Sequence, residues 1–174
     1  RSYLQKLRRE TRRVTKDLLR KKLSWSSVLS QVSTEFVAML CRNVCLRYYI
    51  PGEVILNQGE KCRLGESDIH LILAGQVKAE GTETGVTLGT LVAGEVVGEA
   101  GAFGLAQERT ATTRAWSEGL VCTARIAGSL VEAALDAHPE VRETLRSVFK
   151  GRVGANAHKS EDRKKWLEEV AIPA

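Results

Sequence analysis

From residue 45 to about residue 126, the chain alternates short β-leaning runs with turn signals, and this alternation limits its fold more than any other feature. Glycine, proline and asparagine mark the turns, as in Pro51-Gly52, which is typical of a type II turn. Many short strands at regular spacing predict a sandwich or barrel. The predicted strands are Cys45–Ile50, Val54–Leu56, Ile69–Leu73, Gln76–Ala79, Val86–Val92 and Leu120–Ala124.

Helical periodicity replaces this pattern on both sides of the strands. Residues 3–23 and about 33–43 have apolar positions at helical spacing, and so do two segments after residue 127, which His138-Pro139 separates. Residues 61–67 are interpreted as an exposed loop. His70 lies alone inside a predicted strand, and we interpret it as a packed or half-exposed side chain rather than a ligand-binding residue.

The segment Gly94–Ala115, which we call the cassette, is dense in glycine and alanine but carries Glu99 and Arg109. Glycine lets a backbone approach a ligand closely, and amide groups in such a turn form a concave nest for an anion. Arg109 adds a planar, permanently charged group that suits phosphate. Because Glu99 would repel a phosphate, we expect it to face another part of the ligand, such as a pair of hydroxyl groups.

Positive charge is concentrated at the N-terminus. Residues 1–24 carry ten Lys and Arg and two acidic residues, a net charge of +8, although the whole chain has only +5. Such a basic helix can bind nucleic acid or anionic lipid. We favour a solvated face or an acidic partner segment, because only Tyr3 supplies a nearby aromatic side chain. We expect no nucleic acid partner, and the N-terminal helices are candidates for holding a homo-oligomer together.

Several classes of protein are disfavoured by what the sequence lacks. It contains no signal peptide and no apolar run near the roughly 18 residues that span a bilayer. Its four cysteines form no paired CxxC units, so we expect reduced thiols and no metal site. It has no GxSxG or GxxxxGK[ST] motif, so we predict that it is not an enzyme and needs no cofactor. Because it opens with Arg1 rather than Met, we expect it to be part of a longer protein.

The residues that match a known family lie in the predicted strands and in the cassette. They are Pro51-Gly52-Glu53, Leu73-Ala74-Gly75-Gln76-Val77, Gly98-Glu99 and Arg109-Thr110-Ala111. From about Leu23 to Val153, the chain resembles the cyclic nucleotide-binding domain family. The resemblance implies an α+β fold, in which an antiparallel, jelly-roll-like β-roll of about eight strands is accompanied by helices. These are N-terminal helices, a short phosphate-cassette helix and two C-terminal helices.

The resemblance also implies a ligand and the residues that bind it. The ligand would be cAMP or cGMP, with Arg109 paired to the cyclic phosphate and Glu99 accepting from the ribose 2′-hydroxyl. Backbone amides at the start of the cassette would complete the cradle, and Thr110 would touch the phosphate or a guanine edge. The helix 139–153 would cover the base. The implied ligand-binding residues are Gly98, Glu99, Ala100, Gly101, Arg109, Thr110, Ala111 and Arg152.

Two features depart from the family pattern. Glu99 and Arg109 are one position further apart than expected, so we expect the loop Gly104–Glu108 to bulge. The charge of Glu108 beside Arg109 would weaken the affinity for phosphate. Some family members keep the roll but have lost ligand binding, usually together with the arginine. Because Arg109 and Glu99 are both present, we favour binding over a degenerate roll.

The flanks of the roll resemble those of one class of parent protein. Residues 14–23 resemble the last linker helix between a channel pore and its nucleotide domain, and Phe36–Leu40 resembles the first helix of a channel-type domain. The resemblance implies a regulatory domain at the cytoplasmic face of a membrane, which couples cyclic nucleotide binding to gating of an ion channel or transporter. The alternative is a regulatory domain of a cyclic nucleotide-dependent protein kinase. The predicted divisions are a linker-like helix (1–24), a cyclic nucleotide-binding domain (25–154) and a C-terminal extension (155–174).

Overall fold

The computed structural model describes residues 16–17, 19–21, 23–24, 26, 28–81 and 86–149. In chain order, its elements are η1 (Leu29–Gln31), α2 (Thr34–Leu40), β1 (Val44–Tyr49), β2 (Val54–Leu56), β3 (Ile69–Ala74), β4 (Gln76–Glu80), β5 (Thr87–Val92), β6 (Val96–Val97), α3 (Glu99–Ala102), β7 (Thr112–Ala115), β8 (Val121–Ile126) and α4 (Gly128–Ala137). The described residues within 16–24 and residues 140–149 are also helical. Among the helices of the described residues, none has the length and apolar character needed to cross a membrane.

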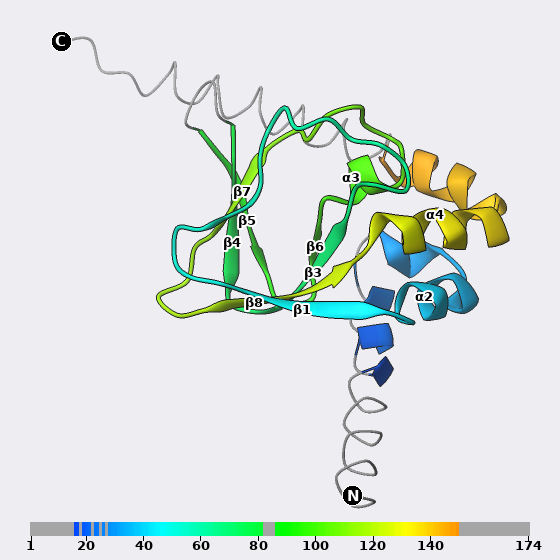
Figure 1. Ribbon diagram of the computed structural model, residues 1–174, viewed down its shortest axis with the longest axis horizontal. Coiled ribbons are helices and arrows are strands. Elements are labelled where there is room, and N and C mark those ends of the chain that lie inside the picture. Colours follow the sequence, from blue (N-terminus) through cyan, green and yellow to red (C-terminus); the bar gives the residue numbers. More distant parts are fainter. Residues whose placement is uncertain are drawn as a thin grey trace, which may run out of the picture.

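Eight antiparallel strands form two four-stranded sheets, which together make a roll (Figure 1). The first sheet has the strand order β1-β8-β3-β6, and the second has the order β2-β7-β4-β5. The helices α2 and α4 lie together at one end of the roll, with the short helix α3 close to them (Figure 1). The predicted α+β roll is therefore confirmed.

Strand β3 contributes to two hydrophobic cores, because its side chains alternate between the two faces of the first sheet. Ile69 and Leu71 belong to the larger core, which also holds the buried side chains of α2 and α4. Ile72 belongs to the smaller core, together with Val77 and Val121. Since the smaller core draws side chains from both sheets, it fills the inside of the roll.

Phe36 connects the helices to the cassette. Its helix α2 begins after Ser33, whose hydroxyl accepts a hydrogen bond from the Phe36 amide at 3.3 Å. The Phe36 ring is fully buried and its centroid lies 6.3 Å from that of Phe103, the C-cap of α3. It also lies 6.1 Å from the ring of His138 at the end of α4. Helix α2 therefore contacts both the cassette, through Phe103, and the end of α4, through His138.

The helix predicted over about 33–43 is shorter in the structure. It ends at Leu40, and Val44, directly after the predicted helix, begins strand β1. Val44 lies opposite Ile126 in the antiparallel pairing of β1 with β8. Helical spacing is a local signal, and here the pairing with a distant strand overrides it.

The turn between β3 and β4 requires glycine at position 75. Gly75 has a φ of +85°, and a Cβ atom there would lie 3.2 Å from the Val121 Cα atom. We expect Gly75→Ala to lower the free energy of unfolding by about 1–3 kcal/mol, because both the backbone and the packing become strained.

The matched control for this change is Gly89→Ala. A Cβ atom on Gly89 would meet no atom within 4 Å, so we expect a change of no more than about 0.5 kcal/mol. Chemical denaturation of both variants measures the difference. Equal losses of stability would contradict the requirement at position 75.

Candidate functional site

A sharp turn brings the end of β6 and the start of α3 against Arg109. Gly98 is the N-cap of α3 and has a φ of +85°. A Cβ atom on Gly98 would lie 2.8 Å from Arg109 Nη1 and 2.8 Å from the Asp68 carbonyl oxygen. A Cβ atom on Gly101 would lie 3.1 Å from the same Nη1. These glycines therefore give the guanidinium room to lie against the cassette backbone.

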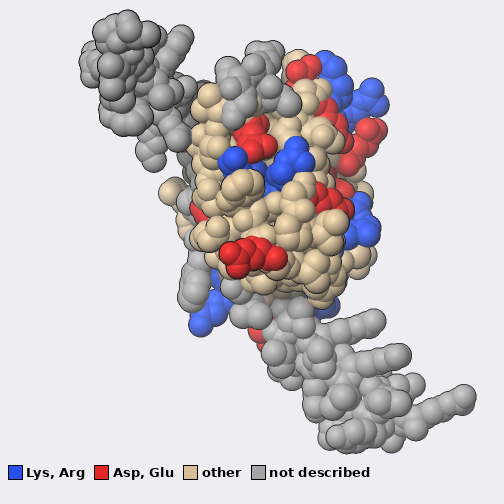
Figure 2. All heavy atoms as spheres, turned by 90° about the vertical axis from the view of Figure 1, so that its left-hand side faces the viewer, with Lys and Arg blue, Asp and Glu red and all other residues tan. Residues whose placement is uncertain are grey.

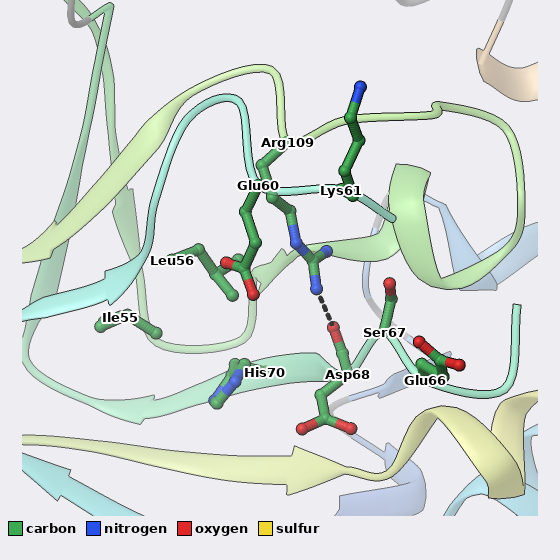
Figure 3. A pocket seen from close by; sticks show the side chains of 9 residues that line it. All are labelled: Ile55, Leu56, Glu60, Lys61, Glu66, Ser67, Asp68, His70 and Arg109. Carbon is green, nitrogen blue, oxygen red and sulfur yellow. Dashed lines mark hydrogen bonds between the residues drawn. The ribbon is translucent and has the colours of Figure 1, made fainter. Parts of the chain in front are cut away.

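The Arg109 side chain is buried, although its charge is permanent. The residue is only 8% exposed. Its Nη1 donates to the Gly98 carbonyl oxygen at 2.6 Å. Its Nη2 donates to the Asp68 carbonyl oxygen at 3.2 Å, the bond that is drawn in Figure 3. Its Nε is buried and has no hydrogen-bond partner within the described part of the chain. Because a buried donor without an acceptor is costly, this guanidinium is suited to bind a further acceptor.

The loop before β3 packs onto the cassette, so the interpretation of residues 61–67 as an exposed loop is partly wrong. Cys62 packs against Gly101, and Ser67 is only 7% exposed. The reason is a set of backbone hydrogen bonds between distant segments, which local sequence patterns do not reveal. These bonds run from Gly59 N to Arg109 O at 2.9 Å, from Arg109 N to Glu60 O at 2.9 Å and from Cys62 N to Gln107 O at 2.8 Å.

The longer turn of the cassette folds back on α3. The backbone amides of Leu105 and Ala106 donate to the Ala100 carbonyl oxygen at 2.8 Å and 3.1 Å. Beyond this turn, the Glu108 carboxylate forms an ion pair at the surface with Lys61, which partly neutralises its charge. The effect of Glu108 on phosphate affinity stays a prediction, but its nearest ionic partner is Lys61 rather than Arg109.

Apart from Arg152, the other predicted ligand-binding residues lie in the cassette on both sides of Arg109. Thr110 is exposed and Ala111 is half-buried, and both precede strand β7. Arg152 lies outside the described residues. The roles assigned to all of these residues stay predictions. The residues of the first turn of α3 are Glu99, Ala100 and Gly101.

A cavity of about 280 Å³ lies beside Arg109, between the cassette and the start of β3 (Figure 3). Its volume is close to the lower limit of about 300–1,000 Å³ that is usual for small-molecule sites. Sequence reasoning assigned Arg109 to the site but missed the other lining residues. The one available signal was strand alternation, which places His70 and Ile72 on the same inner face. The lining residues are Ile55, Leu56, Glu60, Lys61, Glu66, Ser67, Asp68, His70 and Arg109.

His70 is packed, which agrees with the sequence interpretation of a packed or half-exposed side chain. The residue is 5% exposed, and its Nδ1 lies 3.1 Å from Thr123 Oγ1 and 3.5 Å from the Tyr49 hydroxyl oxygen. Burial lowers the pKa of His70 from 6.5 to about 4. The imidazole is therefore neutral near pH 7, and the positive charges that line the cavity come from Lys61 and Arg109.

Other charged groups of the roll are paired with one another. Lys78 Nζ lies 2.9 Å from one carboxylate oxygen of Glu80, and Arg114 Nε lies 3.6 Å from the other. Figure 2 shows acidic and basic side chains intermingled on the face of the roll that lies away from α2 and α4. No group of three or more His, Cys, Asp or Glu in the described part of the chain is placed to hold a metal ion.

Comparison with protein families identifies the class of domain that this fold and cassette define. The model of the cyclic nucleotide-binding domain matches residues 46–133, half of the 174-residue chain. The chain therefore belongs to the cyclic nucleotide-binding domain family. The matched segment runs from β1 into α4 and includes the whole cassette. No curated protein matches the chain by sequence.

The buried histidine makes the stability of the fold depend on pH. Because the pKa of His70 is lower in the folded chain than its usual 6.5, the unfolded chain binds more protons between pH 6.5 and about 4. We expect the free energy of unfolding to fall as the pH is lowered through this window, with about 2–3 kcal/mol from His70. His70→Gln should remove this part of the pH dependence. Denaturant unfolding of both proteins at about pH 7 and about pH 4.5 tests it, and parallel pH profiles would contradict it.

Proposed function

We propose that the chain is a regulatory domain that binds cAMP or cGMP in the cassette, with Arg109 holding the cyclic phosphate. The observation that carries this proposal is the environment of Arg109. Its guanidinium is buried against two carbonyl oxygens, and its Nε has no partner among the described residues. A buried charge is costly unless an opposite charge or a full set of hydrogen bonds compensates for it. A cyclic phosphate would supply the opposite charge.

The glycines of the cassette fit a ligand that approaches its backbone. Cβ atoms on Gly98 and Gly101 would fill space beside the guanidinium, where the phosphate is proposed to bind. Backbone amides of the first turn of α3 would donate further hydrogen bonds to the phosphate, and the helix dipole would favour its negative charge. Glu99 stands at the start of this turn. We assign it to the ribose 2′-hydroxyl, because a carboxylate accepts from a hydroxyl but repels a phosphate.

The helix that follows α4 is proposed to cover the base. Within its described part, residues 140–149, Val141 is 2% exposed and Leu145 is 1% exposed, and both belong to the larger core. This helix therefore starts from a fixed position beside α4. A ligand that contacts this helix near Arg152 would change the conformation of the part that follows the fixed start. Binding would then shift the population of the covered state.

The parent protein is proposed to be a cyclic nucleotide-regulated channel or transporter, with this domain at the cytoplasmic face of the membrane and without enzymatic activity of its own. Support comes from the linker-like helix. Leu19 is 3% exposed and Leu23 is fully buried, and both belong to the larger core together with Phe36 and Leu135. A linker that shares a core with α2 and α4 would transmit their movement.

Isothermal calorimetry with cAMP and with cGMP tests the central proposal. We expect the unmodified chain to bind at least one of them and Arg109→Gln to bind it roughly 10- to 100-fold more weakly, because a charge-assisted contact to phosphate is lost. Arg47→Gln is the matched control, since Arg47 is an exposed residue of β1. No binding of either nucleotide to the unmodified chain would disprove the proposal.

The proposed role of Glu99 is tested with a ligand that lacks one hydroxyl group. We expect 2′-deoxy-cAMP to bind the unmodified chain about tenfold more weakly than cAMP, because a hydrogen bond to a charged group is lost. Glu99→Gln should reduce this discrimination between the two ligands. If cGMP is the ligand, the deoxy form of cGMP replaces that of cAMP. Equal affinities for the two forms would refute the ribose assignment.

A further inference from the structure

Asp68 lies between the cassette and α4, and its backbone and its side chain face different partners. It immediately precedes β3, and it is only half-buried. Its carbonyl oxygen accepts from Arg109 Nη2 at 3.2 Å, as the dashed line in Figure 3 shows. Its carboxylate points away from this contact, on the other side of the chain (Figure 3). Asp68 therefore contacts the phosphate-binding arginine through its backbone, and its charged side chain can bind other groups.

The carboxylate of Asp68 caps helix α4. It accepts from the Gly128 backbone amide at 2.9 Å and from Arg125 Nε at 2.5 Å. The N-cap residue of α4, Ala127, forms no side-chain cap of its own. A carboxylate at a helix N-terminus satisfies a backbone donor and interacts favourably with the helix dipole. The hydrogen bond to Asp68 also raises the pKa of Arg125, which agrees with a stable ion pair.

The backbone around Asp68 lies closely against the start of α4. A Cβ atom on Gly128 would lie 2.7 Å from both the backbone nitrogen and the carbonyl oxygen of Ser67. Ser67 is held in turn, since its Oγ accepts from the Arg63 amide at 3.0 Å. Because these neighbours are backbone atoms, they cannot move aside as a flexible side chain would. Residues 66–68 therefore lie close enough to the start of α4 for the Asp68 carboxylate to hold the Gly128 amide.

The two hydrogen bonds of Arg109 differ in length, and the longer one is the contact to Asp68. The bond to the Gly98 carbonyl oxygen measures 2.6 Å and the bond to the Asp68 carbonyl oxygen 3.2 Å. Hydrogen bonds near the upper limit of the normal range are the weaker ones. Phosphate oxygens form stronger, charge-assisted bonds with arginine than neutral carbonyl groups do. A phosphate that binds the unpaired Nε and draws the guanidinium toward itself would therefore weaken the Asp68 contact first.

We propose that Asp68 is a positioning residue that couples the state of Arg109 to the N-terminus of α4. Without ligand, the guanidinium holds the Asp68 carbonyl group, and the carboxylate holds Gly128. When a phosphate binds the unpaired Nε and draws the guanidinium toward itself, the longer bond to the Asp68 carbonyl group weakens and the Asp68 backbone moves together with the start of α4. The ligand-dependent half of this coupling rests on the proposed function, whereas the linkage from Arg109 through Asp68 to Gly128 does not.

The linkage is tested first without ligand, by amide hydrogen exchange and chemical shifts of the 174-residue chain. We expect Asp68→Ala to speed exchange of the Gly128 amide about fivefold, the size of effect expected for a lost helix cap. Asp68→Asn keeps an acceptor oxygen and should restore part of the protection. Asp136→Asn is the control, because it neutralises an exposed carboxylate at the other end of α4. Arg109→Gln should shift the Gly128 resonance in the unmodified background but not in Asp68→Ala.

The ligand-dependent half is tested by adding saturating cAMP or cGMP to the same variants. We expect exchange at Gly128 to change in the unmodified chain and in Asp136→Asn, to stay constant in Asp68→Ala and to change partially in Asp68→Asn. An undiminished response in Asp68→Ala, or in Asp68→Asn should the alanine variant not fold, would overturn the coupling. If neither nucleotide binds the unmodified chain, the proposed function fails. The ligand-free experiment then tests the linkage alone. If the Gly128 resonance does not shift in Arg109→Gln, the linkage is overturned.

Discussion

The burial of the Arg109 guanidinium constrains the surrounding structure more than any other interaction. A permanent charge with 8% exposure needs acceptors close by, and the chain supplies them as the carbonyl oxygens of Gly98 and Asp68. Their approach is possible only because Gly98 adopts a left-handed conformation and has no Cβ atom. The strand pairing of the roll brings these groups together from segments that are distant in sequence. The geometry of the cassette therefore follows from the requirement to bury one charge.

The roll connects this charge to the helices through a single strand. Strand β3 begins at the residue after Asp68, and its side chains belong alternately to the larger core and the smaller core. Close-packed cores resist small displacements, so a change at the start of β3 is not absorbed locally. Phe36 adds a second route, since its ring packs against Phe103 of the cassette and against His138 at the end of α4. The cassette and α4 are therefore mechanically linked on two sides.

Sequence reasoning predicted the strands and the cassette well, because turn signals and glycine-rich segments are local features. The six predicted strands and the helix that begins at Gly128 are present with boundaries within about two residues, whereas β6 and β7, which lie inside the cassette, were not predicted from local patterns. The same reasoning failed for residues 61–67 and for Asp68, whose partners are distant in sequence. Backbone bonds to Gln107 and Arg109, and a cap on Gly128, leave no periodic pattern in the chain. The walls of the cavity are defined by such non-local contacts, so the sequence revealed its arginine but not its acidic residues.

A roll without a ligand would not benefit from this arrangement. Replacing a buried, incompletely paired charge by an apolar side chain of similar volume is often neutral or stabilising, and the Arg109 Nε has no partner in the described residues. A degenerate domain would therefore gain stability from an apolar residue at this position, whereas a domain that binds an anion requires the charge. The burial of Arg109 beside two glycines thus favours a binding site over a scaffold. In the proposed coupling, Arg109 loosens its contact to the Asp68 carbonyl group. This change would have a regulatory effect only because the Asp68 carboxylate is bound to the start of α4.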